Sequence, residues 1–246
     1  MHRNFTGHLV FGFAAALLAV ASSAPALGTT IPISNPSFES PNLGGVGGTA
    51  FSFGVNGGWT DTGTPITWNN AAYTSNIPFT SVPDGTQVAG LGAAGGADNS
   101  TISQALTTDL VANTTYTLSF YVGQANSVFG PYDGYRAVFS AGGVTLASDN
   151  SAVTPGVGSF LQDTLTFDSA TATPAQLAVI GDPLTITLYQ GNSPTSGGVV
   201  AFDLVQLSGT ADPGSAPEPA TWLLLGAGIG AIALFNRARR SVARGR

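Results

Sequence analysis

The sequence predicts an all-β protein, an antiparallel β-sandwich of jelly-roll type. Apolar and polar residues alternate over several stretches, and this period of two places successive side chains on opposite faces of a strand. Threonine, valine, tyrosine and phenylalanine are frequent in these stretches, and 33 glycines and 15 prolines supply the turns between them. We therefore expect roughly ten short strands, flanked by an N-terminal signal helix and a C-terminal transmembrane sorting helix.

The first half of the folded body combines short strands with long loops. A first strand is expected over Ile31–Glu39, and a glycine-rich loop follows over Pro41–Gly58. The sequence Pro83-Asp84-Gly85 is typical of a tight turn, because proline fixes φ and glycine tolerates positive φ. Further strands are expected near Trp59 and over Pro65–Trp68, Gln87–Gly92 and Thr101–Leu106.

The second half carries the most regular strand patterns. Alternation is clearest in Thr115–Gly123, and the residues on its predicted core face are Tyr116, Leu118, Phe120 and Val122. The pair Gly142-Gly143 predicts a hairpin turn. The strands joined by this turn are Tyr135–Ala141 and Val144–Ala147, and the remaining strands are Phe160–Phe167, Leu184–Gln190 and Val199–Leu207.

Both ends of the chain have the composition of targeting segments. Met1–Gly28 begins with a positive charge at Arg3, continues with an apolar stretch over Leu9–Ala21 and ends in small residues, as a secretory signal peptide does. We divide the chain into a signal peptide (1–28), a β-sandwich domain (29–210), a linker (211–216) and a sorting segment (217–246).

The C-terminal segment has three parts in a defined order. Two prolines hold Pro217-Glu218-Pro219 extended, an apolar transmembrane segment follows over 222–235, and a basic tail ends the sequence. The tail residues are Arg237, Arg239, Arg240, Arg244 and Arg246. At 14 residues the apolar run is shorter than the ~20 that a stable span needs, which favours a transient sorting helix.

This order of parts resembles the PEP-CTERM sorting signal of exopolysaccharide-producing Gram-negative bacteria. The residues that carry the resemblance, besides the apolar segment, are Pro217, Glu218, Pro219, Arg237, Arg239 and Arg240. The resemblance implies that an exosortase is the processing partner, that the precursor sits in the inner membrane during sorting, and that the cleaved protein reaches the cell surface or extracellular matrix. An ordinary C-terminal membrane anchor is the alternative.

Charge distinguishes the body from the two ends. The whole chain has 7 Lys+Arg and 13 Asp+Glu, a formal net charge of −6. Without the targeting segments, Arg136 is the one basic residue left against twelve acidic residues, so the body has a formal charge of −11. Nucleic-acid binding is excluded, because contacts with phosphate groups need several Lys or Arg side chains.

Missing residue types exclude several classes of catalytic site. Both histidines, His2 and His8, lie in the signal peptide, the chain has no cysteine, and the body has no lysine. Catalytic triads, lysine nucleophiles and histidine-ligated zinc are therefore excluded. Carboxylates remain, and the candidates for a glycoside hydrolase pair are Asp61, Asp84, Asp133, Asp163 and Asp203. Because aspartate is common at turns, we expect the protein not to be an enzyme.

The body also resembles the galactose-binding-like jelly-roll domains, a group that includes carbohydrate-binding modules. The similar motifs, in chain order, are Asn35-Pro36-Ser37-Phe38-Glu39, Asp84–Ala89, Ile102–Leu106, Thr115–Gly123 and Val200–Val205. The resemblance implies a structural calcium ion between the first and last strands, at positions matching Glu39 and Asp203. Calcium prefers such oxygen ligands. The alternative is that both carboxylates accept hydrogen bonds from loop amides.

One loop has the composition of a ligand-binding site. Aromatic faces stack on sugar rings, and charged or amide groups bind sugar hydroxyls. The predicted ligand-binding residues are Phe129, Tyr132, Asp133, Tyr135 and Arg136. Trp59, Trp68 and Tyr73 are further aromatic candidates, although tryptophan in a sandwich is more often part of the core.

Taken together, these patterns predict an exported, exosortase-sorted surface or matrix protein with a structural or adhesive role in exopolysaccharide or biofilm. The first alternative is a carbohydrate-binding module that recognises a specific glycan. The second alternative is a carboxylate-dependent glycoside hydrolase.

Overall fold

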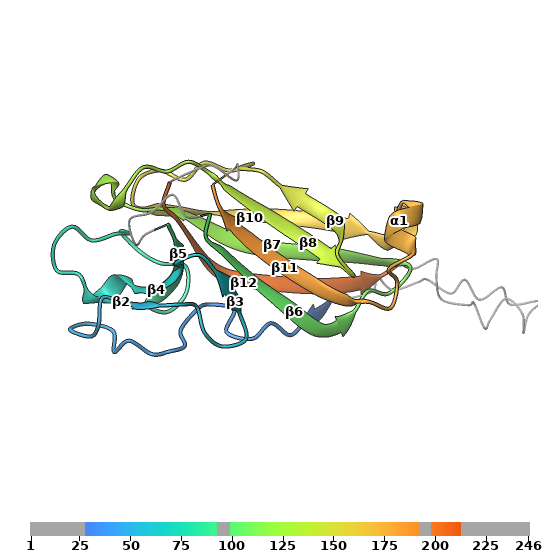
Figure 1. Cartoon of the computed structure of the whole chain (residues 1–246), viewed down its shortest axis with the longest axis horizontal. Coiled ribbons are helices and arrows are strands. Elements are labelled where there is room, and N and C mark those ends of the chain that lie inside the picture. Colours follow the sequence, from blue (N-terminus) through green and yellow to red (C-terminus); the bar gives the residue numbers. More distant parts are fainter. Residues whose placement is uncertain (1–27, 93–98, 192–197, 213–246) are drawn as a thin grey trace, which may run out of the picture.

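The computed structural model describes residues 28–92, 99–191 and 198–212. These residues form two antiparallel sheets that lie face to face, as Figure 1 shows. The predicted antiparallel β-sandwich is therefore confirmed. The predicted signal helix, most of the linker and the sorting helix lie outside the described residues. Within the described ranges, no helix combines the length and apolar character needed to cross a membrane.

The larger sheet has seven strands. Six follow one another in the order β10, β7, β12, β5, β4 and β2, and β1 pairs with β12. Their bounds are Ser159–Asp168 (β10), Thr114–Gln124 (β7), Val200–Ala211 (β12), Gln87–Leu91 (β5), Ile66–Asn69 (β4), Phe51–Phe53 (β2) and Thr29–Ile31 (β1). Strands far apart in sequence are thus neighbours, as a jelly-roll arrangement requires.

The smaller sheet has five strands in the order β3, β6, β11, β8 and β9. Their bounds are Thr60–Thr62 (β3), Thr101–Asp109 (β6), Pro183–Gln190 (β11), Tyr135–Ala141 (β8) and Val144–Asp149 (β9). A single short α-helix in the described part of the chain, α1 (Pro174–Leu177), lies at the end of the molecule opposite the long loops (Figure 1). Three 3₁₀ turns complete the fold, η1 (Asn70–Ala72), η2 (Ser127–Phe129) and η3 (Ser169–Thr171).

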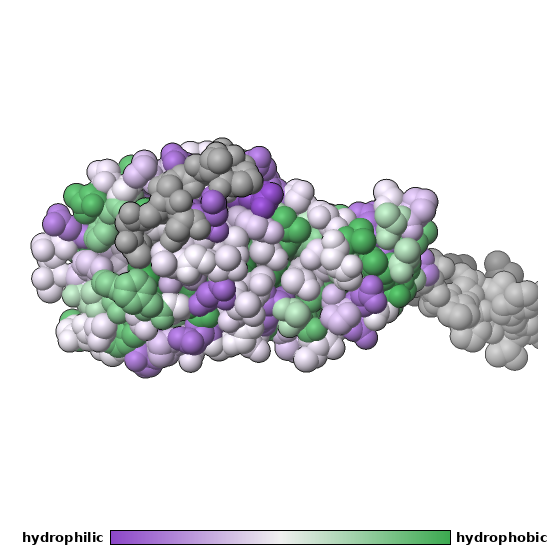
Figure 2. All heavy atoms as spheres, in the orientation of Figure 1, coloured by the Kyte–Doolittle hydropathy of each residue, from purple (hydrophilic) through white to green (hydrophobic). Residues whose placement is uncertain are grey.

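The main core lies between the two sheets, where the alternation of the sequence predicts it. The four residues predicted on the core face of β7 are all buried, namely Tyr116, Leu118, Phe120 and Val122. On β11 the buried set is Leu184, Ile186 and Leu188. Burial of each such side chain contributes about 1.5–3 kcal/mol, so the two inner faces together provide most of the stabilisation. The front face in Figure 2, over β6, β11 and β8, is mostly pale, as expected for a solvent-facing surface of threonine and serine.

The first predicted strand is wrong beyond Ile31. β1 ends there, and the chain from Asn35 to Phe38 forms a turn in which both of these residues adopt left-handed backbone conformations, with φ of 47° and 57°. Phe38 is fully buried, and its ring centroid lies 5.4 Å from that of Trp59, which is also buried. Burial of the aromatic ring therefore takes precedence over the extended conformation that the local sequence suggests.

A bulge in β12 interrupts its pairing with β7. The register between the two strands shifts between Asp203 and Gln206, and Leu204 at this point has a φ of 46°. The amide of Val205 donates a hydrogen bond to the carbonyl of Pro36 instead of to β7. β-Bulges of this kind re-aim side chains. The acidic residues Asp203 and Glu39 and a surface groove lie beside this bulge.

Candidate functional site: a buried carboxyl–tyrosine cluster

Two tyrosines and two aspartates meet at an open edge of the sandwich. Tyr135 is the first residue of β8, and Tyr132 lies in the loop before it. Asp149 ends β9, and Asp163 lies in the middle of β10 on the inward face that it shares with the buried Leu165. Because β9 and β10 are the edge strands of their respective sheets, these residues lie at the boundary between core and solvent.

The cluster is centred on a short hydrogen bond between Tyr135 and Asp163. The Tyr135 hydroxyl donates to Oδ2 of Asp163 at 2.8 Å, and the backbone amide of Thr164 donates to Oδ1 at 2.7 Å. Tyr135 is fully buried and Asp163 is 7% exposed. The Tyr135 hydroxyl also accepts a hydrogen bond from the amide of Val153, at 3.3 Å. These contacts hold the carboxyl of Asp163 in one orientation.

The surroundings of Asp163 shift the pKa of its carboxyl upward. Burial raises the pKa of its carboxyl above the ordinary value of 3.8, and the nearby carboxyl of Asp149 raises this pKa further. The hydrogen bonds from Tyr135 and Thr164 act in the opposite direction, but the net pKa is still raised. Burial and the hydrogen bond to Asp163 also raise the pKa of Tyr135, so this residue stays a neutral hydroxyl donor.

Tyr132 borders the same two carboxyls. Its hydroxyl oxygen is buried and has no hydrogen-bond partner among the described residues. Burial, followed by the charges of Asp149 and Asp163, raises the pKa of Tyr132 to about 12. A buried hydroxyl without a partner costs about 1–3 kcal/mol. The cluster therefore contains one polar group whose hydrogen-bonding capacity is unused.

The predicted ligand-binding loop does not form one continuous surface. Tyr132 and Tyr135 point into the cluster described above, whereas Asp133 is exposed. The guanidinium of Arg136 lies 3.9 Å from the centre of the Tyr189 ring, on the outer face of the smaller sheet. The sugar site at this loop stays a prediction.

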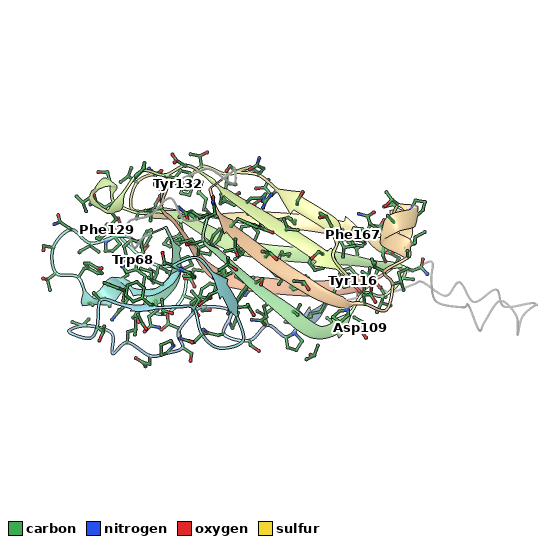
Figure 3. The ribbon with its side chains drawn as sticks, in the orientation of Figure 1. Trp68, Asp109, Tyr116, Phe129, Tyr132 and Phe167 are labelled. Atoms are coloured by element: carbon green, nitrogen blue, oxygen red, sulfur yellow. The ribbon has the colours of Figure 1, made fainter. Side chains whose placement is uncertain are left out.

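Phe129, the remaining member of the five predicted ligand-binding residues, belongs to a second apolar cluster. Its ring centroid lies 5.0 Å from that of Trp68 and 5.6 Å from that of Tyr73, and the labelled positions in Figure 3 show Phe129 and Trp68 together. The indole nitrogen of Trp68 donates to the hydroxyl of Tyr73 at 3.0 Å. Trp68 is buried, as predicted for a core tryptophan, and these rings pack on one another instead of presenting an open stacking face.

Asp149 is not among the residues predicted from the sequence, and Asp163 is predicted only as one of five possible hydrolase carboxylates. The strand pattern did indicate that Asp163 is unusual, because it lies two residues before Leu165 and four before Phe167 and therefore on the same face of the strand. An aspartate on the core face of a strand is unusual and points to a partner or a function. Nothing in the local sequence indicates that Asp149 lies beside it.

The two residues predicted to bind calcium lie at one turn. Oε1 of Glu39 accepts hydrogen bonds from the amides of Thr86 (2.8 Å) and Gln87 (2.7 Å). Oδ2 of Asp203 accepts one from the amide of Asp84, at 2.9 Å, and its Oδ1 accepts one from Leu204, at 2.7 Å. Both carboxylates thus bind loop amides, as in the alternative stated above. Among the described residues, no group of three or more His, Cys, Asp or Glu is placed to hold a metal ion.

Asp203 is fully buried and electrostatically unusual. Burial, together with the charges of Asp84 and Glu39, raises the pKa of its carboxyl to about 7, although its two amide hydrogen bonds act in the opposite direction. The turn is therefore an acidic site in which one carboxyl titrates near neutral pH.

Comparison with known proteins identifies the family. The family model described as HpiC1 cyclase (HpiC1-like) matches residues 29–208, and a model of the PEP-CTERM protein-sorting motif matches residues 215–240. The chain belongs to the HpiC1-like cyclase family. No curated protein matches the chain.

Solved structures of Stig cyclases share the fold. The chain is 23% identical to the Stig cyclase FisC from Fischerella sp. TAU in complex with (3Z)-3-(1-methyl-2-pyrrolidinylidene)-3H-indole. The match covers 76% of this chain and 100% of FisC, with a TM-score of 0.62. A cyclase from Fischerella sp. TAU in complex with 4-(1H-indol-3-yl)butan-2-one has 23% identity, coverage of 75% and 98%, and a TM-score of 0.60.

These findings confirm one prediction and correct another. The PEP-CTERM motif is confirmed, and it indicates export and exosortase-mediated sorting to the cell surface. The expectation that the protein is not an enzyme is wrong, because its body belongs to a family of cyclases. The expectation failed because it assigned the candidate aspartates to turns, whereas Asp163 and Asp203 are buried within strands.

Proposed function

We propose that the sandwich promotes the cyclisation of an apolar, unsaturated substrate by donating a proton from Asp163. The observation that carries this proposal is the buried Asp163 carboxyl, whose pKa is raised by burial and by Asp149. Membership of the HpiC1-like cyclase family supports the reaction class. A body without His, Cys or Lys relies on carboxylic acids for proton transfer near neutral pH.

Each residue of the cluster has a role in this proposal. Burial and the neighbouring Asp149 raise the pKa of Asp163, which favours a proton on its carboxyl. Asp163 gives this proton to a double bond of the substrate, the ring closes onto the resulting cation, and loss of a proton from the product returns it to the carboxylate. Atoms and electrons balance without a co-reactant. The Tyr135 hydroxyl and the Thr164 amide stabilise the charge that forms on Asp163.

Tyr132 is the residue that would move to admit a substrate. Its hydroxyl has no partner in the described structure, so rotating the side chain outward breaks no hydrogen bond within the protein. The loop that carries it precedes β8, where Tyr135 fixes the proton donor. An indole-sized ring that replaced the phenol would lie against the carboxyl pair in surroundings with little water.

The test uses the purified full chain. The indole compounds in the two cyclase structures serve as binding probes in isothermal titration calorimetry, and a panel of alkene-bearing indoles serves as substrates. NMR is the appropriate readout, because cyclisation leaves the mass unchanged. We expect Asp163→Asn to lower turnover about 10²-fold or more while binding persists. Asp109→Asn, an exposed carboxylate at the end of β6, is the matched control. Unchanged turnover in Asp163→Asn would refute the assignment.

A structural or adhesive role in exopolysaccharide or biofilm is the second candidate function. It is supported by the PEP-CTERM motif, which sends the protein to the cell surface, where such a matrix lies. Loss of matrix cohesion on deletion of the protein, restored by the Asp163→Asn variant, would favour this role over catalysis.

A calcium ion at the acidic turn is compatible with the residues present there. Glu39 and Asp203 offer the hard oxygen ligands that calcium prefers. A divalent cation would also neutralise the repulsion that Asp84 and Glu39 exert on Asp203. We retain calcium as a structural component of the proposal, and no step of the reaction depends on it.

A further inference from the structure

The outer face of the seven-stranded sheet carries hydroxyl groups in register. Thr30 pairs with Ser208, Ser208 with Thr117, and Thr117 with Thr166, so that one row of hydroxyls crosses β1, β12, β7 and β10. A second row, of Gln206, Ser119 and Thr164, runs beside it. Neighbouring strands lie about 4.7–4.9 Å apart, so the first row extends roughly 14 Å.

These side chains face solvent and are available to a ligand. Leu118 and Leu207, which alternate with them along β7 and β12, are buried in the core, so the hydroxyl residues point to the other side of the sheet. In the part of the chain that the structure describes, no hydrogen bond engages the side chains of Thr117, Ser119 or Ser208. Each hydroxyl can therefore donate one hydrogen bond and accept others.

Part of this face lines a groove of about 430 Å³, to which β1, β7, β12 and the segment after β1 contribute but β10 does not. The polar residues of its lining are Thr30, Thr117, Ser119, Gln206 and Ser208, and the apolar ones are Ile31, Pro32, Ile33, Pro36, Val205 and Leu207. The bulge in β12 lies at this groove, where the amide of Val205 donates a hydrogen bond to the carbonyl of Pro36 and both residues belong to the lining. The groove thus combines hydroxyl groups with apolar side chains, among them the rings of Pro32 and Pro36.

The charge of the groove selects among possible ligands. All of its lining residues are uncharged, and the body around it carries twelve acidic residues against one arginine. An anionic ligand would be repelled, and a cationic ligand would find no carboxylate in the groove. Hydroxyl and amide groups in rows, beside apolar rings, match a polymer that is rich in hydroxyls and has apolar C–H faces.

We propose that this groove binds a neutral polysaccharide chain. Within the groove the row crosses three strands, β1, β12 and β7, which suits consecutive sugar units better than a single sugar. Export to the cell surface brings the groove to where such polymers occur. The site is independent of the proposed acid catalysis, since Thr164 and Thr166 lie on the opposite face of β10 from Asp163.

The test is affinity electrophoresis of the purified full chain in gels that contain a soluble neutral polysaccharide. Dextran, galactomannan and a mixed-linkage glucan are the neutral probes, and alginate is the anionic probe. We expect retardation by at least one neutral polymer and none by alginate. Thr117→Val combined with Ser208→Ala removes two hydroxyls with little change in shape. Each lost hydroxyl should weaken binding about two- to tenfold, so the double variant should bind at least about fourfold more weakly.

Thr187→Val is the matched control, because Thr187 lies half-buried on β11 of the other sheet. It should bind like the wild type, and equal melting temperatures would show that all variants are folded. The proposal is overturned if no neutral polymer retards the wild type, if alginate does so more strongly, or if the double variant binds as well as the control. Turnover by the Asp163 site should be unchanged in the double variant, so failure of one proposal leaves the other standing.

Discussion

Titration of Asp203 should make the protein less stable as the pH rises through neutrality. The carboxyl has an ordinary pKa of 3.8 when the chain is unfolded and a pKa of about 7 when it is buried in the fold. Between these values the folded state binds more protons than the unfolded state, so the free energy of unfolding falls with increasing pH. The stabilisation is complete below pH 3.8 and is lost through about pH 7.

The size of the effect follows from the same two pKa values. Their difference corresponds to ~4 kcal/mol of unfolding free energy over the whole range from below pH 3.8 to above pH 7, of which ~3 kcal/mol falls between pH 5 and pH 8. Asp203→Asn removes the titration and should flatten this dependence. The substitution also takes an acceptor from the amide of Asp84, which costs about 1–3 kcal/mol at every pH.

The assay is urea unfolding of the wild type and Asp203→Asn at pH 5 and pH 8, with the same ionic strength and with EDTA present. Subtracting the variant's pH dependence from that of the wild type isolates Asp203 from the other carboxyls. The reasoning is refuted if the wild type is equally or more stable at pH 8, or if the two proteins show the same pH dependence.

Two further predictions concern the acidic turn and the packing of the sheet. If calcium binds Glu39 and Asp203, then adding calcium at about 100 times its dissociation constant should raise the unfolding free energy by ~2.7 kcal/mol; an unchanged melting temperature on moving between calcium and EDTA would contradict calcium binding. Gly123→Ala should destabilise the protein by about 1–3 kcal/mol, because its new Cβ would meet the ring of Phe160. Denaturant unfolding measures this loss, and Gly209→Ala on β12 is the matched comparison, because its new Cβ would meet its nearest neighbours at an ordinary 3.5 Å. A fully stable Gly123→Ala would show that Phe160 can move aside.

Local pattern was sufficient to predict most of the strands. β7 and β11 alternate so regularly that only one face of each can enter the core, and the structure buries that face. The hairpin of β8 and β9 followed in the same way from its two glycines. The turn at Asn35–Phe38 could not be predicted, because it depends on Phe38 reaching Trp59, 21 residues further along the chain.

The proton-donating cluster was beyond the reach of local sequence for a similar reason. Tyr135 and Asp163 are separated by 28 residues, and they meet only because β8 and β10 belong to facing sheets whose edges come together. The position of Asp163 on the core face of its strand marked it as unusual. Its raised pKa, however, arises from burial and from Asp149, and both depend on the assembled sandwich.

The sequence by itself determined the destination of the protein, the excess of acidic over basic residues in its body, and the absence of His, Cys and Lys from that body. Composition and linear order are enough for these properties. The tertiary structure decided which carboxyls are buried next to one another and which hydroxyls line up across strands. Burial and the distance between carboxyls set a pKa, and the distances between hydroxyls set the fit of a ligand. A chain acquires this burial and these distances only when its strands pair.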